Sequence, residues 1–148
     1  MCIYYKNYMN KSRLLIFLFL LFVQISHSQL IKTGDEWGST VFYIDGNKLK
    51  KENKWGESVY FFDGQTIRLR DKWGEPLYFI DGETVRVKDK WGEPLYFFDG
   101  QNIRSKDKWG KTLYYIDGKY IRYQNKWGVT VYYFECNPEK WVLTCLMR

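Results

Sequence analysis

The 148-residue chain contains no alanine and a single histidine, His27. Alanine is the best helix former, and a glycine interrupts the body of the chain every eight or ten residues, so helix is excluded as a main element. His27 lies in a segment that we predict to be removed. The rest of the chain then offers no Ser-His-Asp triad, no Cys-His pair and no histidine metal site.

Carboxylate chemistry is also poorly supported. A catalytic pair of carboxylates needs two environments that push the two pKa values apart, but the aspartates Asp63, Asp81 and Asp99 stand in identical local contexts. Each of these contexts supplies one aspartate and lacks the spaced acidic ligands of a calcium loop. We therefore expect a protein that is not an enzyme and has no catalytic residues, no cofactor and no metal site.

The chain has no apolar run long enough for a good membrane span, which needs ~20 residues. Its longest run is the ten residues 14–23, preceded by Lys11 and Arg13 and followed by a small-x-small sequence that ends at Ser28. This pattern predicts a secretory signal peptide over 1–28, with cleavage near Ser28-Gln29. An uncleaved anchor is the alternative, and no cysteine follows the run to carry a lipid.

An exported location follows from the leader: periplasmic, cell-surface or extracellular, with no membrane span once the leader is gone. Either Met1 or Met9 can be the start codon. The leader contains three of the 23 basic residues and none of the 17 acidic ones, so the body has a net charge of only +3. Charges of both signs alternate along it, and we expect no nucleic-acid partner despite the sequence pI of 9.1. Residues 29–148 make one domain of ordinary size.

Cysteine is scarce, and one of the three cysteines, Cys2, lies in the leader. In an oxidising compartment the remaining two, Cys136 and Cys145, are a candidate disulfide. Pairing requires that their Cβ atoms meet, which the sequence leaves open.

The body of the chain is an 18-residue repeat. A Trp-Gly pair and an Asp-Gly pair recur in one register, and such a fixed period indicates a repeat architecture. The units begin at Trp37, Trp55, Trp73, Trp91, Trp109 and Trp127, and the Asp-Gly pairs begin at Asp45, Asp63, Asp81, Asp99 and Asp117.

Each unit has two short β-branched and aromatic runs separated by two turn signals, which predicts a β-hairpin. Asp81-Gly82 predicts a type I′ turn with these two residues at its centre. Residues 89–92 (Asp-Lys-Trp-Gly) predict a type I turn with a left-handed glycine, in which the side chain of Asp89 bonds back to the backbone of the turn. We predict that one side of the hairpin faces the core, formed by Tyr78, Ile80, Val85 and Val87, and that the other carries Leu77, Phe79, Thr84 and Arg86.

The ends of the body depart from the repeat. Residues 29–36 are predicted to be a short polar lead-in. The tail has Glu135-Cys136-Asn137-Pro138 in place of the Asp-Gly turn, and we predict a sixth hairpin with a different loop that caps the array. The fold class is thus all-β: tandem antiparallel hairpins, five full units and a degenerate sixth, arranged as a flower-like ring or a short stacked solenoid.

The unit KWGEPLYFFDGQNIR at 90–104, together with the leader, resembles the bacterial four-fold beta flower proteins. The resemblance covers about Trp37 to Phe134 and implies short hairpins around a pseudo-symmetry axis, in a family without an established function. This chain departs from a four-fold pattern in its number of units. A second, looser resemblance is to the cell-wall-binding (choline-binding type) repeats, through YFFDG at 60–64 and YYIDG at 114–118. Those repeats stack as a solenoid and hold ligands between aromatic side chains, but here the tryptophan precedes a turn glycine, which is not their usual arrangement.

The repeated tryptophans are the candidate ligand-binding residues. If they are exposed, they would suit stacking on sugars or caging a cationic headgroup. If they are covered, each one seats its turn against the next unit. We favour the covered arrangement, because six exposed indoles together would be an aggregation hazard. The residues concerned are Trp37, Trp55, Trp73, Trp91, Trp109 and Trp127.

A second row is basic. The simpler interpretation of this row is a solvated face on which the aliphatic parts of the basic side chains lie over aromatic rings. The more specific interpretation is a surface that binds an anionic polymer. The row consists of Lys50, Arg68, Arg86, Arg104 and Arg122.

Two functions remain for the chain. The first is an exported, non-enzymatic structural or interaction protein of the envelope or secreted space. The alternative is a module that binds a glycan or cell-envelope polymer through the turn tryptophans. The sequence does not identify the partner.

Overall fold

The computed structural model describes residues 28–147 and shows an all-β protein with one short helix. The predicted leader, apart from Ser28, lies outside the described residues. The elements in chain order are β1 (Ser28–Thr33), β2 (Thr40–Asp45), β3 (Lys48–Lys51), β4 (Ser58–Phe62), β5 (Thr66–Leu69), β6 (Pro76–Asp81), β7 (Thr84–Val87), β8 (Pro94–Asp99), β9 (Asn102–Ser105), β10 (Thr112–Asp117), β11 (Tyr120–Tyr123), β12 (Thr130–Phe134) and α1 (Lys140–Leu146).

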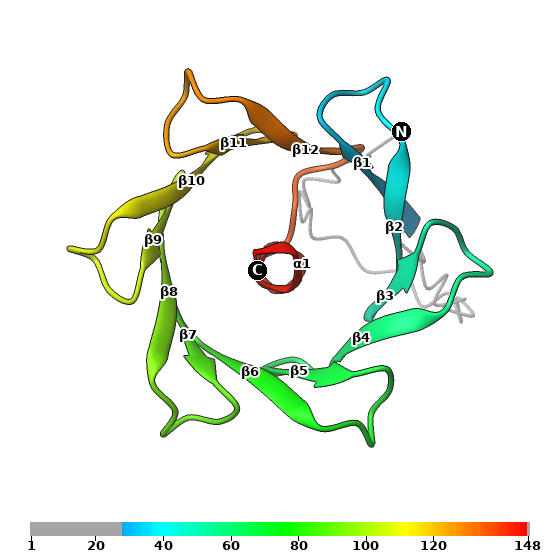
Figure 1. Cartoon of the computed structure of the whole chain (residues 1–148). Coiled ribbons are helices and arrows are strands. Elements are labelled where there is room, and N and C mark those ends of the chain that lie inside the picture. The colour runs from blue at the N-terminus through cyan, green and yellow to red at the C-terminus, as the bar shows by residue number, and fades with distance from the viewer. Residues whose placement is uncertain (1–27, 148) are drawn as a thin grey trace, which may run out of the picture.

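The strands form one closed sheet in which every neighbour is antiparallel. Each strand from β2 to β12 pairs with the strand before it in the chain, and β1 pairs with both β2 and β12. The hairpins therefore stand side by side around an axis, with their turns at the rims (Figure 1). Of the two predicted arrangements, ring and stacked solenoid, the chain adopts the ring.

The ring has six equivalent hairpins, because the two ends of the sheet-forming chain make the sixth together. Ile31 of β1 pairs with Phe134 of β12, just as Ile67 pairs with Phe62 inside the second hairpin. The prediction of a polar lead-in was wrong: residues 28–33 are the strand that completes the last unit. A strand buries Ile31, and it also satisfies the backbone groups of β12 and β2, which would otherwise be unpaired sheet edges.

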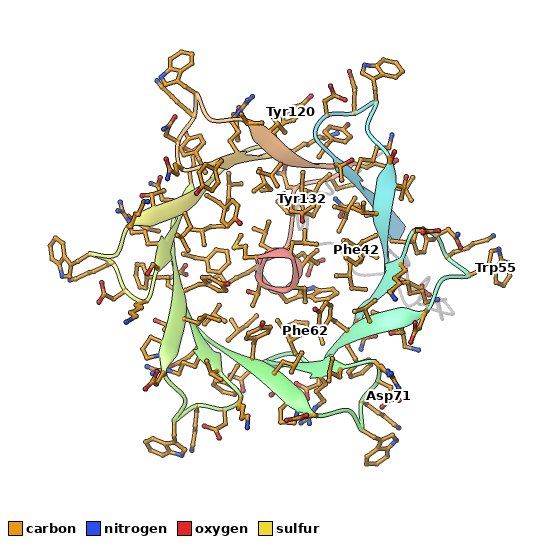
Figure 2. All side chains as sticks on the ribbon, viewed as in Figure 1. Phe42, Trp55, Phe62, Asp71, Tyr120 and Tyr132 are labelled. Carbon is orange, nitrogen blue, oxygen red and sulfur yellow. The ribbon has the colours of Figure 1, made fainter. Side chains whose placement is uncertain are left out.

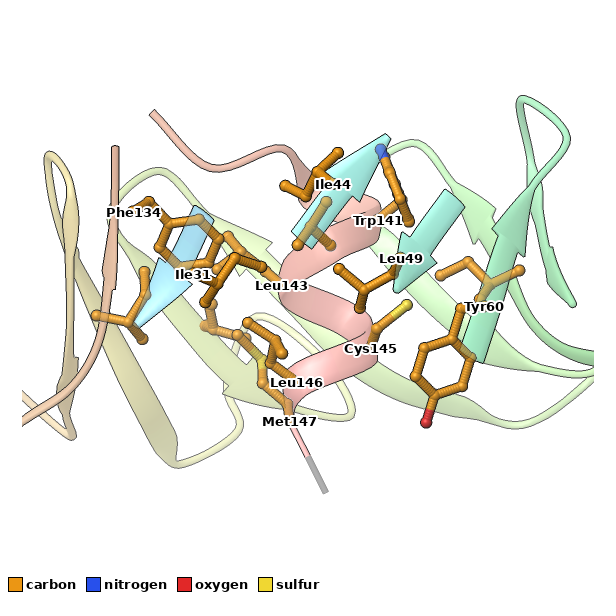
Figure 3. Close-up of a cluster of buried hydrophobic side chains, with 14 of the residues drawn as sticks. Ile31, Ile44, Leu49, Tyr60, Phe134, Trp141, Leu143, Cys145, Leu146 and Met147 are labelled. Atoms are coloured by element: carbon orange, nitrogen blue, oxygen red, sulfur yellow. The ribbon is translucent and has the colours of Figure 1, made fainter. Parts of the chain in front are cut away.

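The tail is also different from the prediction. It forms no hairpin of its own, because β1 already occupies the free edge of β12. It turns inward instead and forms α1, which runs along the axis of the ring (Figures 1 and 3). A helix satisfies its own backbone hydrogen bonds, so it can fill an apolar interior without a strand partner. Every residue from Trp141 to Met147 is buried, as expected for a helix that is surrounded on all sides.

The predicted core face of the hairpin is confirmed. The second-strand residue that points to the axis is 0% or 1% exposed in all six units, and the aromatic and aliphatic residues of the first strands pack beside it. Val87, at the rim, is 37% exposed. The six axial residues are Ile31, Leu49, Ile67, Val85, Ile103 and Ile121.

The turn at Asp81-Gly82 is displaced by one residue from the prediction. Asp81 pairs with Thr84, so Gly82 and Glu83 are the two central residues. Gly82 has a φ of 59°, whereas Glu83 is not among the residues with positive φ, which is the pattern of a type II′ turn rather than type I′. The two strands therefore pair one residue further along the chain than predicted, and each side chain stays on the face of the hairpin that was predicted for it.

Helix α1 is fixed at both rims of the ring. At the rim of the Asp-Gly turns, Lys140 Nζ donates to the carbonyl of Gly82 at 2.7 Å and to Glu83 Oε2 at 3.0 Å. In the interior, Trp141 stacks on Phe62 with ring centroids 5.4 Å apart and ring planes 6° apart. At the other rim, the hydroxyl of Tyr96 donates to the carbonyl of Met147.

The structure does not show the candidate disulfide between Cys136 and Cys145. Cys145 lies in α1 and is 4% exposed. Cys136 lies in the segment that leads from β12 into the helix, where its carbonyl accepts a hydrogen bond from Gln29 Nε2 at 2.8 Å. Because the tail forms α1, the thiol of Cys145 lies among the core side chains (Figure 3). The predicted sixth hairpin, which would have carried both Cys136 and Cys145, does not form in the described tail.

Candidate binding surface on the tryptophan turns

The candidate surface consists of six similar turns at one rim, which we call the tryptophan turns. Each one is six residues long: 34–39, 52–57, 70–75, 88–93, 106–111 and 124–129. In the fourth, the Gly92 amide donates to the carbonyl of Asp89 at 3.0 Å, and the Trp91 amide donates to Asp89 Oδ1 at 2.8 Å. Both bonds recur in all six turns. The predicted type I turn and its side-chain bond are thus confirmed, and the backbone at each tryptophan is fixed in place.

The turn glycine is required for a different reason from the one predicted. Gly92 does not have a left-handed φ. Instead, a Cβ at this position would lie 1.7 Å from the carbonyl oxygen of Val87, and the other five turn glycines meet the same obstacle. The left-handed residue is Lys88, with a φ of 62°, which precedes the turn aspartate. Only glycine allows the two arms of the turn to approach this closely.

The six tryptophans are exposed, and the prediction that they are covered was wrong. Their exposed fractions lie between 83% and 87%. Figure 2 shows an indole at the tip of each outer turn, pointing away from the axis, with Trp55 labelled. The physical reason is the closure of the sheet: around a ring the turns diverge, so no neighbouring unit reaches an indole to cover it. The divergence also keeps the indoles apart, which removes the continuous apolar patch that made exposure unfavourable.

A lysine lies beside five of the indoles. In each case the lysine that precedes the tryptophan places its Nζ 4.9–5.1 Å from the ring centroid, within the range of a cation–π contact. In the first turn Glu36 stands in this position. These lysines were missed as site residues, although their constant place before the tryptophan was a visible signal. Each occupies one face of its indole and leaves the other face available for a ligand.

A single indole with a lysine above it is a poor cage for a cation. The ammonium group of Lys90 already occupies the position over the Trp91 ring that a cationic headgroup would take. The surface beside this indole is hollowed into a cavity of about 360 Å³ lined by both nonpolar and charged groups. Its lining residues are Val87, Lys88, Asp89, Trp91, Gly92 and Glu93. The arrangement is suited to a neutral or anionic ligand with a flat face.

The predicted basic row is half-buried and neutralised. Arg86 Nε lies 3.3 Å from Asp81 Oδ2, and the other four cations of the row make the same ion pair with the aspartate of their own Asp-Gly pair. Arg86 Nη1 also donates to the carbonyl of Gly92, at 3.3 Å. Arg86 therefore links the Asp-Gly pair of its own unit to the tryptophan turn that begins the next unit. One member, Arg122, lies over an aromatic ring, that of Tyr120. The row therefore contributes to the wall of the ring more than to a surface for an anionic polymer.

Within residues 28–147, the pKa is shifted for Asp63 and for Tyr114. Partial burial raises the pKa of Asp63, but hydrogen bonds from the Thr66 amide, the Arg68 side chain and the Gln65 amide outweigh it, so the pKa lies below its ordinary value of 3.8. On the inner face, burial and the neighbouring phenols of Tyr132 and Tyr123 raise the pKa of Tyr114.

A second cavity, also of about 360 Å³, opens on the inner side of the same rim, where β1 meets β2. Its walls include Phe42 and Tyr132, with Thr33 at the place that Leu69 occupies in the second hairpin. Within residues 28–147, no group of three His, Cys, Asp or Glu side chains is placed to hold a metal ion. No helix in the same part of the chain is long and apolar enough to cross a membrane.

The fold and the site together define a closed ring of six β-hairpin repeats with an axial helix and one exposed indole per unit. Comparisons with protein-family models, with curated proteins and with solved structures give no match.

Proposed function

We propose that this chain is an exported, non-enzymatic binding protein that holds a glycan or another polymer of the cell envelope against its tryptophan turns. The observation that carries the proposal is the exposure of six indoles, 83–87% each, on a backbone that two hydrogen bonds fix in every turn. A rigid aromatic platform gives contact area to a ligand at little cost in conformational entropy. Six such platforms around a ring also allow one polymer chain to bind at several points, which raises its overall affinity.

The sheet boundaries are compatible with the predicted export. Cleavage near Ser28-Gln29 would leave residues 29–33 of β1 in place, including Ile31, which closes the core. The new N-terminal residue, Gln29, would keep its hydrogen bond to the carbonyl of Cys136. The leader, the exported location and the likeness to the beta flower family remain predictions.

Tryptophan fluorescence tests the proposal, since six of the seven indoles are exposed and the seventh, Trp141, is buried. We expect acrylamide to quench most of the emission of the processed chain. A bound polysaccharide or peptidoglycan fragment should shift this emission and protect it from the quencher. The measurement is a titration with neutral and acidic polysaccharides and with isolated peptidoglycan.

The control is a variant in which all six turn tryptophans are alanine and Trp141 is kept. It should retain the circular dichroism of the parent chain, because the six indoles make little contact with the core, and it should lose the response. A parent chain whose emission responds to none of these polymers would contradict the proposal.

A further inference from the structure

The six tryptophan turns are not equal in charge. Turns 106–111 and 124–129, which are neighbours on the ring, contain Lys106, Lys108, Lys111 and Lys126 against the single acid Asp107, a net charge of +3. We propose that these two turns, here called the basic arc, are the primary site of the ring and bind an anionic, carboxylated polysaccharide. This inference rests on the proposed function and gives it a ligand class and a place on the ring.

The other four turns have no net positive charge. By the same count turns 34–39 and 52–57 carry −2 and −1, and turns 70–75 and 88–93 are neutral. In addition, Glu57 of turn 52–57 lies 3.6 Å from Lys51 and 3.9 Å from Arg70. Among the described residues, none of the four lysines of the basic arc forms an ion pair. Their charge is therefore available to a ligand.

The basic arc also has exposed aromatic and apolar side chains. Besides Trp109 and Trp127, it includes Val129, which is 80% exposed, and it adjoins Tyr123, which is 52% exposed. Tyr120 and Tyr133 lie against each other on the outer wall between these units, toward the rim of the Asp-Gly turns, with ring centroids 5.2 Å apart. The place of Tyr120 is occupied in the other units by Leu30, Lys48, Thr66, Thr84 and Asn102. Phenol hydroxyls on this wall add hydrogen-bonding groups for sugar hydroxyls.

Charge and stacking surface lie next to each other within each turn of the basic arc. Lys108 Nζ is 5.1 Å from the centroid of the Trp109 ring, and Lys126 Nζ is 4.9 Å from that of Trp127. A sugar that stacks on the free face of such an indole has the lysine on the opposite face, so the ammonium group attracts a carboxylate around the edge of the ring. The pairing is exposed, so the attraction should weaken as salt is added.

A flexible polymer fits this geometry better than a flat membrane does. The indoles point outward from the axis and diverge from one turn to the next (Figure 2), so a planar surface cannot receive all of them. A chain can follow the perimeter from one turn to its neighbour. Arc-dependent binding to anionic vesicles in place of a polysaccharide is accordingly an outcome that would overturn the proposal.

The test compares dextran with carboxymethyl-dextran, which share a backbone and differ in charge. The arc variant is K106Q/K108Q/K126Q. Its matched control is K88Q/K90Q/K72Q, which removes the same number of charges from equivalent positions of two other turns. We expect the parent chain to prefer carboxymethyl-dextran. The affinity of the arc variant for carboxymethyl-dextran should fall about tenfold, and that of the control less than about threefold, because each exposed charge contributes only a modest free energy.

Three results would overturn the basic arc: equal losses in the two variants, equal affinity of the parent chain for the two dextrans, or arc-dependent binding to vesicles of anionic phospholipid without binding to carboxymethyl-dextran. If the emission of the parent chain still responds to neutral glycans, only the basic arc fails. If no glycan or peptidoglycan alters that emission, the proposed function fails with it.

Discussion

At the scale of single residues, the backbone of each tryptophan turn is fixed by its aspartate or asparagine and by its glycine, while the indole is left free. Trp91→Ala should therefore change the free energy of unfolding by less than about 0.5 kcal/mol, as is usual for an exposed side chain. Trp141→Ala, which removes the indole stacked on Phe62 in the core, should cost about 3–5 kcal/mol. Urea unfolding of the two variants measures the contrast, and a large loss for Trp91→Ala would show that the indole is covered after all.

The turn glycine gives a second residue-scale prediction. In Gly92→Ala the new Cβ would overlap the carbonyl oxygen of Val87, at 1.7 Å, so the turn must open. We expect a loss of at least about 3 kcal/mol, at the upper end for single substitutions. Gly82→Ala is the control: it has a left-handed φ of 59° but no atom within 4 Å of the new Cβ, and should cost only about 1–2 kcal/mol. Similar losses in thermal unfolding of the two variants would refute the steric argument.

The pKa of Asp63 makes stability depend on pH in a defined direction. Because this pKa is lower in the folded chain than its ordinary value of 3.8, the ionised carboxylate stabilises the fold above that pH. The contribution is lost as the pH falls through the folded-state pKa. Asp63→Asn should thus lower the free energy of unfolding by about 1 kcal/mol near pH 7, because it removes an ion pair that is partly exposed and screened by solvent. The difference between this variant and the parent chain should shrink below pH 3.8.

Urea unfolding between pH 2.5 and pH 7 measures this difference. Asp81→Asn is the comparison, since it also breaks an ion pair with the arginine of the next strand. A difference between Asp63→Asn and the parent chain that stayed constant down to pH 2.5 would contradict the assignment.

At the scale of elements, the repeated strands could be predicted from the sequence and the two terminal elements could not. Each hairpin carries its turn signals within 18 residues, and its alternation places the core face even when the turn centre is wrong by one residue. The hairpin partner of β1, in contrast, is β12, about a hundred residues away, so no Asp-Gly turn signal joins these two strands. A signal did exist: Ile31 and Lys32 stand 18 residues before Leu49 and Lys50, in the register of the repeat.

Helix α1 was missed for a different reason. Its run from Trp141 to Met147 is short and apolar except for Thr144, and a run of this length has no periodicity that separates a buried strand from a buried helix. The choice is made by the ring, which has no free sheet edge and an apolar interior. The exposure of the tryptophans was mispredicted on the same ground, because it follows from the closure of the sheet and not from the residues of the turn.

The axial helix should contribute strongly to stability. Leu143 is 2% exposed at the centre of the ring, and Leu143→Ala should cost about 2–5 kcal/mol through lost burial and a residual cavity. Val129→Ala, at a residue that is 80% exposed, is the control and should have almost no effect. Thermal unfolding compares them. A small loss for Leu143→Ala would mean that α1 packs loosely and that the strands hold the ring alone.

At the scale of the whole molecule, the ring depends on a contact between the two ends of the sheet-forming chain. Deleting residues 29–33 should open the closed sheet, because it removes Ile31 from the core and leaves β2 and β12 with unpaired edges. We expect the shortened chain to unfold at lower temperature and to self-associate through these edges, measured by light scattering beside a chain that begins at Gln29. A synthetic peptide of residues 29–34 should restore the monomer, since it can occupy the vacant place between β2 and β12 by strand addition. A shortened chain that stayed monomeric with an unchanged melting temperature would show that the ring does not need β1 to close.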